Sequence, residues 1–247
     1  MKSRLTSRRT SRRILSVPVV ALLLAVAALP LAAQAQSLAD ARGSSGGIAV
    51  APPIQLYVAY TRPTTKVKVH NYLFDAFGPY PIGANALVAA INLADKTPPE
   101  WRQGMAGYGE RFASNLAIGG VNTTTRYALA QAFHEDTLYY RCECRGLLPR
   151  FNHALISTLT GRHGDEGHRA FSFAALVAPY AGNFTAIYGW YPGRYGAKDA
   201  FRMGNYSLLE YAASNVAFEF LYRGPHSWLS RAHLNNRHGA IEADPVP

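Results

Sequence analysis

The sequence predicts a mainly α-helical fold, a compact bundle of about five to six helices with small-residue packing and one short β-hairpin near residues 157–173. Three observations predict it. A long proline-free stretch carries apolar and small side chains at helical spacing. Shorter stretches on either side show the same spacing and end at Gly or Pro. A glycine-rich polar turn separates the two halves of the expected hairpin.

The longest helix is expected over residues 110–136, where no proline occurs and side chains recur at steps of three and four. At about 1.5 Å per residue it is about 40 Å long. Small residues along it allow other helices to approach closely. They are Ala113, Ala117, Gly119, Gly120 and Ala128. We therefore expect this helix to be the centre of the bundle, with tight packing at Gly120.

Two helices are expected before it. Thr64 or Thr65 can cap a first helix, which ends at Gly78–Pro79. Residues 82–93 then form a helix that is apolar nearly all round. A helix of this kind has no polar face to present to water, so we expect it to be buried.

After the central helix, residues 149–159 and 205–223 carry apolar stripes at helical spacing, and Gly224–Pro225 ends the second stripe. Residues 161–168 form a glycine-punctuated polar turn between them. The segments that flank this turn can pair as a small hairpin.

Residues 170–193 contain no charged side chain, and Pro179 lies within them. We expect a helix of the globular core, broken near Pro179. The alternative is membrane association, because a helix of this length could span a bilayer core of about 30 Å. Aromatic residues at its end would suit a membrane interface. They are Tyr188, Trp190 and Tyr191.

The first 35 residues have the pattern of a signal peptide. Basic residues precede an apolar run, Ile14–Leu29, and Ala33–Ala35 is a typical cleavage site. We expect an exported chain, periplasmic or associated with the cell envelope. Residues 36–53 would be a flexible leader, 54–225 a single helical domain and 226–247 a polar tail.

The charge of the processed chain excludes one class of partner. The whole chain has 25 Lys and Arg against 15 Asp and Glu, but six of the basic residues and none of the acids lie in the expected signal peptide, which leaves 19 against 15. So small an excess does not indicate a nucleic-acid-binding protein. The expected partners are a membrane surface or another envelope protein.

Cys142 and Cys144 are separated by one residue. Three interpretations remain open: a strained redox-active pair, half of a metal site, or two incidental thiols in a turn, which the sequence favours. A bridge between them would close only a very small loop and contribute little entropic stabilisation.

The segments WRQGMAGYGERFASN, HEDTLYY, PRFNHAL, WYP and NVAFEF resemble those of a set of uncharacterised exported bacterial proteins. The resemblance covers roughly residues 98–220. That family has no established activity, so the resemblance implies an exported helical protein and assigns no functional residue.

The densest run of catalytic residue types is His134, Glu135 and Asp136. We expect these residues at the polar end of the central helix, where successive side chains point about 100° apart and do not converge. The acids would then interact with Arg141 or Arg145.

The best candidates for a divalent-metal site are His163, Asp165 and His168, because imidazole and carboxylate groups fall within six residues. Glu166 lies among them, but the spacing matches no common zinc motif. We therefore expect no cofactor.

The sequence favours a non-enzymatic structural or interaction protein of the cell envelope. Uncharged helical runs and the lack of a convergent catalytic set motivate this hypothesis. The alternative is a metal- or thiol-dependent periplasmic enzyme that uses the region of His134, Glu135 and Asp136.

Overall fold

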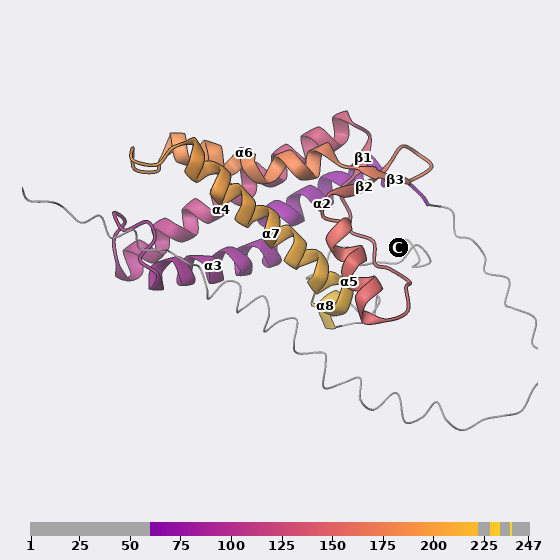
Figure 1. Cartoon of the computed structure of the whole chain (residues 1–247), viewed down its shortest axis with the longest axis horizontal. Helices are drawn as coiled ribbons and strands as arrows, with labels where there is room; N and C mark the ends of the chain where they lie inside the picture. Colours follow the sequence, from indigo (N-terminus) through magenta and orange to yellow (C-terminus); the bar gives the residue numbers. More distant parts are fainter. Residues whose placement is uncertain (1–59, 222–227, 233–237, 239–247) are drawn as a thin grey trace, which may run out of the picture. The chain divides into compact units, whose positions relative to one another are not determined.

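The computed structural model describes residues 60–221, 228–232 and 238. These residues belong to one compact unit, residues 49–247. The expected signal peptide, the flexible leader and most of the polar tail lie outside the described residues. Within these residues the protein is mainly helical, which confirms the predicted fold class (Figure 1).

Helices α2 (Thr65–Phe77) and α3 (Pro79–Ala94) meet at Gly78 and pack along the long helix α4 (Gly104–Ala132). The hydroxyl of Thr64 accepts a hydrogen bond from the N–H of Val67, so the cap expected for the first helix is present. Pro79 begins α3, a position where its missing N–H costs nothing.

Helix α6 (Phe173–Gly189) lies between α4 and α7 (Ala197–Leu221), and α5 (Leu147–Ile156) packs on α7. A short helix, α8 (Trp228–Arg231), follows. The expected break at Pro179 was wrong, because α6 continues through that residue. The helix packs on α4 and α7 on both sides, and these contacts outweigh the one hydrogen bond that proline removes.

The tight helix contact is at Gly182 of α6. A Cβ atom at that position would lie 2.3 Å from the carbonyl oxygen of Ile118 on α4. A Cβ atom at Gly120 would meet nothing nearer than Phe77, at 3.8 Å. The expectation of tight packing at Gly120 was therefore wrong, and the small residue that the α4 contact requires lies on the partner helix.

A three-stranded antiparallel sheet lies at one end of the bundle, with strands β1 (Glu135–Asp136), β2 (Thr160–His163) and β3 (His168–Phe171) in that order. Strands β2 and β3 form the predicted hairpin. Strand β1 was not predicted. The central helix ends at Ala132, and His134 has a φ of 57°, so the chain turns before Glu135 enters the sheet.

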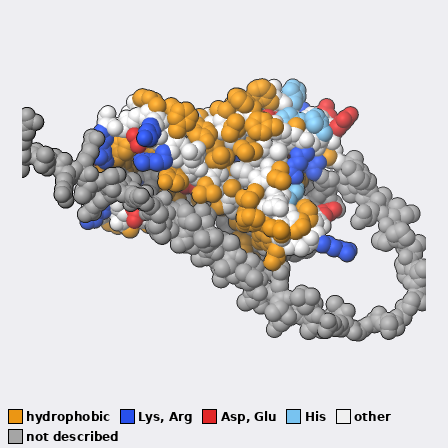
Figure 2. All heavy atoms as spheres, in the orientation of Figure 1, with side chains coloured by type: hydrophobic (Ala, Val, Ile, Leu, Met, Phe, Trp, Pro, Cys, Tyr) orange, Lys and Arg blue, Asp and Glu red, His pale blue; other side chains and the backbone are white. Residues whose placement is uncertain are grey.

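The core is small and polar, whereas many large apolar side chains face outward. Among the described residues, the largest fully buried side chains are Arg111, Glu219, Asn71, Asn183 and Pro179. The apolar residues of the core are mostly alanines. Figure 2 shows hydrophobic side chains spread over α5, α6 and α7 on the viewed face. Small buried residues let the helices approach closely. The space between the helices is then too narrow for many of the large apolar side chains, which stay exposed.

Arg111 joins α4 to the segment that precedes it. Its side chain is 1 % exposed and donates to the carbonyl oxygens of Thr97, Pro98, Arg102 and Gly107 at 2.8 to 3.1 Å. Two of the acceptors, Arg102 and Gly107, lie with Arg111 in the segment WRQGMAGYGERFASN. The four bonds fix the entry of the chain into its longest helix.

Candidate functional site

A pocket of about 90 Å³ lies where the sheet meets the helices α4, α5, α6 and α7. Its lining includes Arg126, Arg162, Arg169, Glu135 and Asp136. Helix α4 supplies Arg126, the short strand after it supplies the two acids, and the hairpin supplies the other two arginines. The sheet therefore places positive arginine side chains and negative carboxylates beside the same pocket.

Glu135 and Asp136 point to opposite faces of the sheet, because side chains alternate along a strand. Asp136 lies opposite Arg162, and Arg162 lies opposite Arg169. On the other face Glu135 lies opposite His163, and His163 opposite His168. The two carboxylates of the acid run thus belong to opposite faces of the sheet, although both residues line the pocket.

Asp136 is held by neutral donors. The hydroxyls of Tyr60 and Tyr140 donate to its Oδ2 at 2.8 and 2.7 Å, and the N–H of Leu138 donates to Oδ1 at 3.0 Å. The guanidinium of Arg162 lies over both tyrosine rings. Burial, and then the nearby Asp136 carboxylate, raise the pKa of both tyrosines, so these hydroxyls stay protonated as donors.

Glu135 accepts a hydrogen bond from the hydroxyl of Ser172, and its Oε1 lies 3.3 Å from Nε2 of His163. The sequence led us to expect that these acids pair with Arg141 or Arg145. No described contact joins either acid to these arginines. The reason is the strand: it carries both carboxylates toward the hairpin and α6. His134 lies apart, with Nδ1 3.2 Å from Arg62.

The metal candidates are distributed over different contacts. The rings of His163 and His168 lie 5.9 Å apart, and His163 contacts Glu135. The carboxylate of Asp165 is 90 % exposed and pairs with Arg62 at 3.3 Å. Within the described part of the chain, no three His, Cys, Asp or Glu side chains are placed to hold a metal ion.

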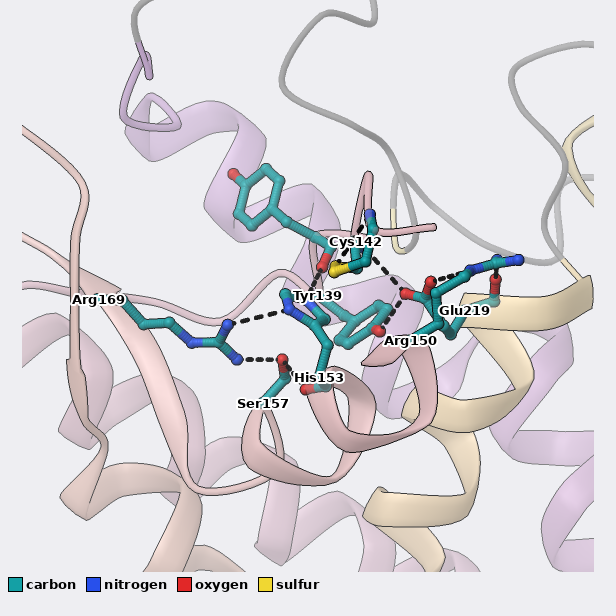
Figure 3. The surroundings of a disulfide bond; sticks show 9 residues. Tyr139, Cys142, Arg150, His153, Ser157, Arg169 and Glu219 are labelled. Atoms are coloured by element: carbon teal, nitrogen blue, oxygen red, sulfur yellow. Dashed lines mark hydrogen bonds and ion pairs between the residues drawn. A yellow bond between two sulfur atoms is a disulfide. The ribbon is translucent and has the colours of Figure 1, made fainter. Parts of the chain in front are cut away.

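Arg169 reaches across the pocket to the inner side of α5 (Figure 3). Its Nε donates to the hydroxyl of Thr160 at 2.8 Å, Nη1 lies 3.2 Å from Nδ1 of His153, and Nη2 donates to Ser157. Because arginine can only donate, Nδ1 of His153 is the acceptor. Nε2 of His153 therefore carries the hydrogen and donates to the carbonyl of Tyr140 at 2.9 Å.

Beside this pocket Glu219 is fully buried (Figure 3). Its carboxylate accepts from Nε of Arg150 at 2.7 Å, from the hydroxyl of Tyr139 at 2.6 Å and from the N–H of Cys142 at 3.0 Å. Burial, and then the hydrogen bond to Glu219, raise the pKa of Tyr139. Among the described residues, Arg150 of α5 is the cation that pairs with Glu219.

Cys142 and Cys144 are joined by a disulfide. This differs from the favoured interpretation of two incidental thiols. The N–H of Cys142 donates to Glu219, which links the turn to α7. A redox role for the pair stays a hypothesis.

Sequence reasoning missed Arg126, Arg169 and Glu219 as parts of a site. An acid between the apolar residues of the α7 stripe was the available signal for Glu219. No local pattern marked the arginines, because β1, the hairpin and α4 bring them together from distant positions.

No helix of the described residues is long and apolar enough to cross a membrane. None of the protein-family models, curated proteins and solved structures compared with this chain matches it.

Proposed function

We propose that the chain is a non-enzymatic interaction protein of the cell envelope that binds a lipid surface through the outward side of α5. The supporting observation is the orientation of this helix. Leu148, Phe151, Leu155 and Ile156 are exposed, and we call them the α5 outer face. The polar residues Arg150 and His153 point inward to Glu219 and Arg169.

The buried ion pair fixes this orientation. Rotation of α5 to bury Leu148 and Leu155 would remove Arg150 from Glu219, whose carboxylate is fully buried. An unpaired buried charge costs about 3–5 kcal/mol. Burial of the four apolar side chains by an external surface would instead contribute on the order of 5 kcal/mol. An external apolar phase would therefore cover the α5 outer face while the Arg150–Glu219 pair stays intact.

Two observations favour lipid over a protein partner. Outward apolar side chains also occur on α2, at Val69, Leu73 and Phe77, so the exposure extends beyond one interface. Arg145 is exposed just before α5, where it can approach anionic headgroups. The ten residues of α5 extend about 15 Å, which suits a helix lying in the plane of the interface.

The test is flotation with vesicles of phosphatidylglycerol and phosphatidylcholine. Residues 36–247 contain the whole compact unit without the expected signal peptide, which would bind lipid by itself. The variant Leu148→Gln with Leu155→Gln should reduce the bound fraction at least tenfold. The control, Met105→Gln, alters a side chain that is 82 % exposed on α4 and should float like the parent.

Two results would overturn the proposal. In one, the parent chain stays unbound at all vesicle concentrations. In the other, the parent chain is a dimer by light scattering and the α5 variant is a monomer, which would assign the α5 outer face to a second copy of the chain.

A further inference from the structure

We propose that the pocket between the hairpin and α5 binds an oxyanion of the phosphate class, held by Arg169 and Arg126. The ligand would lie among the arginine side chains and the hydroxyls of Ser157 and Thr160, which also line the pocket. This site is separate from the α5 outer face, because His153 and Ser157 belong to the inner side of that helix. The inference does not depend on lipid binding.

Arg169 is positioned by neutral groups only. Its three described hydrogen bonds go to Thr160, His153 and Ser157, and each uses a different nitrogen. A guanidinium has five N–H groups, so one remains on each terminal nitrogen. Each of these two N–H groups can donate a charge-assisted hydrogen bond to an oxygen of a phosphate-class anion.

The hairpin places like charges opposite each other. Arg162 and Arg169 are direct cross-strand partners, an arrangement that destabilises a sheet unless an anion compensates it. On the same face Asp136 lies opposite Arg162, so its negative charge offsets one of the two arginines, and Arg169 is the other. Burial lowers the pKa of Arg169, nearby Tyr139 opposes this shift, and the charge of Arg162 adds to it.

Arg126 adds a third positive charge from α4. One of its terminal nitrogens donates to the carbonyl of Thr137 at 3.3 Å, and its guanidinium lies over the ring of Tyr211. Among the described residues, neither Arg126 nor Arg169 forms an ion pair with a carboxylate. The pocket of about 90 Å³ exceeds the share of one water, about 30 Å³.

Phosphate oxygens could come from a free anion or from the headgroup of a phospholipid, and the recognition chemistry is the same. The test therefore measures binding of inorganic phosphate and of glycerophosphoglycerol, a soluble lipid headgroup, by calorimetry on residues 36–247. Chloride at matched ionic strength is the reference. If the Kd of one of these two ligands is lower by tenfold or more, that ligand identifies whether the site takes a free anion or a lipid headgroup.

The main variant is Arg169→Gln, which keeps polar atoms but removes the charge and the two remaining N–H groups. Its Kd for the ligand should rise at least tenfold. The control is Arg202→Gln, because Arg202 is an exposed arginine of α7 that pairs only with Asp199 in the described contacts. Its Kd should stay within twofold of the parent value.

If Arg169→Gln loses the near-ultraviolet circular dichroism of the parent, Arg126→Gln replaces it with the same expected tenfold rise. The proposal is overturned if neither anion binds above the chloride reference, or if the folded arginine variant binds as the parent does. The α5 variant Leu148→Gln with Leu155→Gln should keep the parent's anion affinity, so failure of lipid binding and failure of this site give different results.

Discussion

Arg150 of α5 and Glu219 of α7 lie 69 residues apart in the sequence, and Nε of the arginine donates to the fully buried carboxylate at 2.7 Å. This pair sets the rotation of α5 about its own axis. It thereby turns the α5 outer face to solvent and directs His153 toward Arg169. The exposed apolar surface and one wall of the pocket both depend on it.

Arg150→Met should lower the free energy of unfolding by about 3 kcal/mol, because it leaves the Glu219 carboxylate buried without a cation. Adding Glu219→Leu should recover part of this loss, since the double variant buries no charge. Urea denaturation of the two single variants and the double variant gives the coupling energy. Independent effects of the two substitutions would contradict the role assigned to the pair.

Gly182→Ala should lower the free energy of unfolding by about 1–3 kcal/mol, because its Cβ atom would lie 2.3 Å from the Ile118 carbonyl oxygen. Gly120→Ala is the matched control, since its nearest contact is 3.8 Å away and alanine favours helix by up to about 1 kcal/mol. Thermal melts of both variants measure the difference. Equal effects of the two substitutions would refute the assigned helix contact.

Arg111→Lys should destabilise the chain by about 2–4 kcal/mol although the charge is kept. Lysine has three donors on one nitrogen and cannot reach four carbonyl oxygens arranged around a planar group. Arg202→Lys, at an exposed position, should change stability by less than about 0.5 kcal/mol. Chemical denaturation compares the two, and a small loss for Arg111→Lys would show that its bonds are weak.

Asp75 should make stability depend on acidity. Burial raises its pKa, but attraction to His238 and hydrogen bonds from His238 and Tyr127 outweigh burial, so the pKa lies below its ordinary value of 3.8. The stabilisation is then present above pH 3.8 and is lost as the pH falls through the lower folded-state value. The free-energy difference between parent and Asp75→Asn should shrink as the pH falls below about 4. A difference that grows in acid would contradict this assignment.

The sequence was sufficient for the features that local chemistry decides. Thr64 caps α2 because its hydroxyl meets an unpaired N–H three residues later, and Gly164 and Gly167 take positive φ angles in the turn of the hairpin. Both can be read from a few neighbouring residues. The helical class followed from spacing alone.

The remaining features depend on partners far away in the chain. Asp136 belongs to a strand because it pairs with Arg162, and Glu219 is buried because Arg150 reaches it from another helix. Local spacing suggested a helix end for Asp136 and did not indicate Arg150 as the partner of Glu219. The pocket could not be predicted for the same reason, since the hairpin brings Arg169 beside α5 only in the folded chain.

The most direct test of lipid binding is the depth of position 148 in a membrane. Leu148→Trp, compared with the parent chain to subtract the three native tryptophans, reports the environment of the α5 outer face. With phosphatidylglycerol vesicles that carry brominated acyl chains, the added fluorescence should shift to shorter wavelength and be quenched. An added tryptophan that stays unquenched and unshifted while the chain floats with the vesicles would contradict binding through α5.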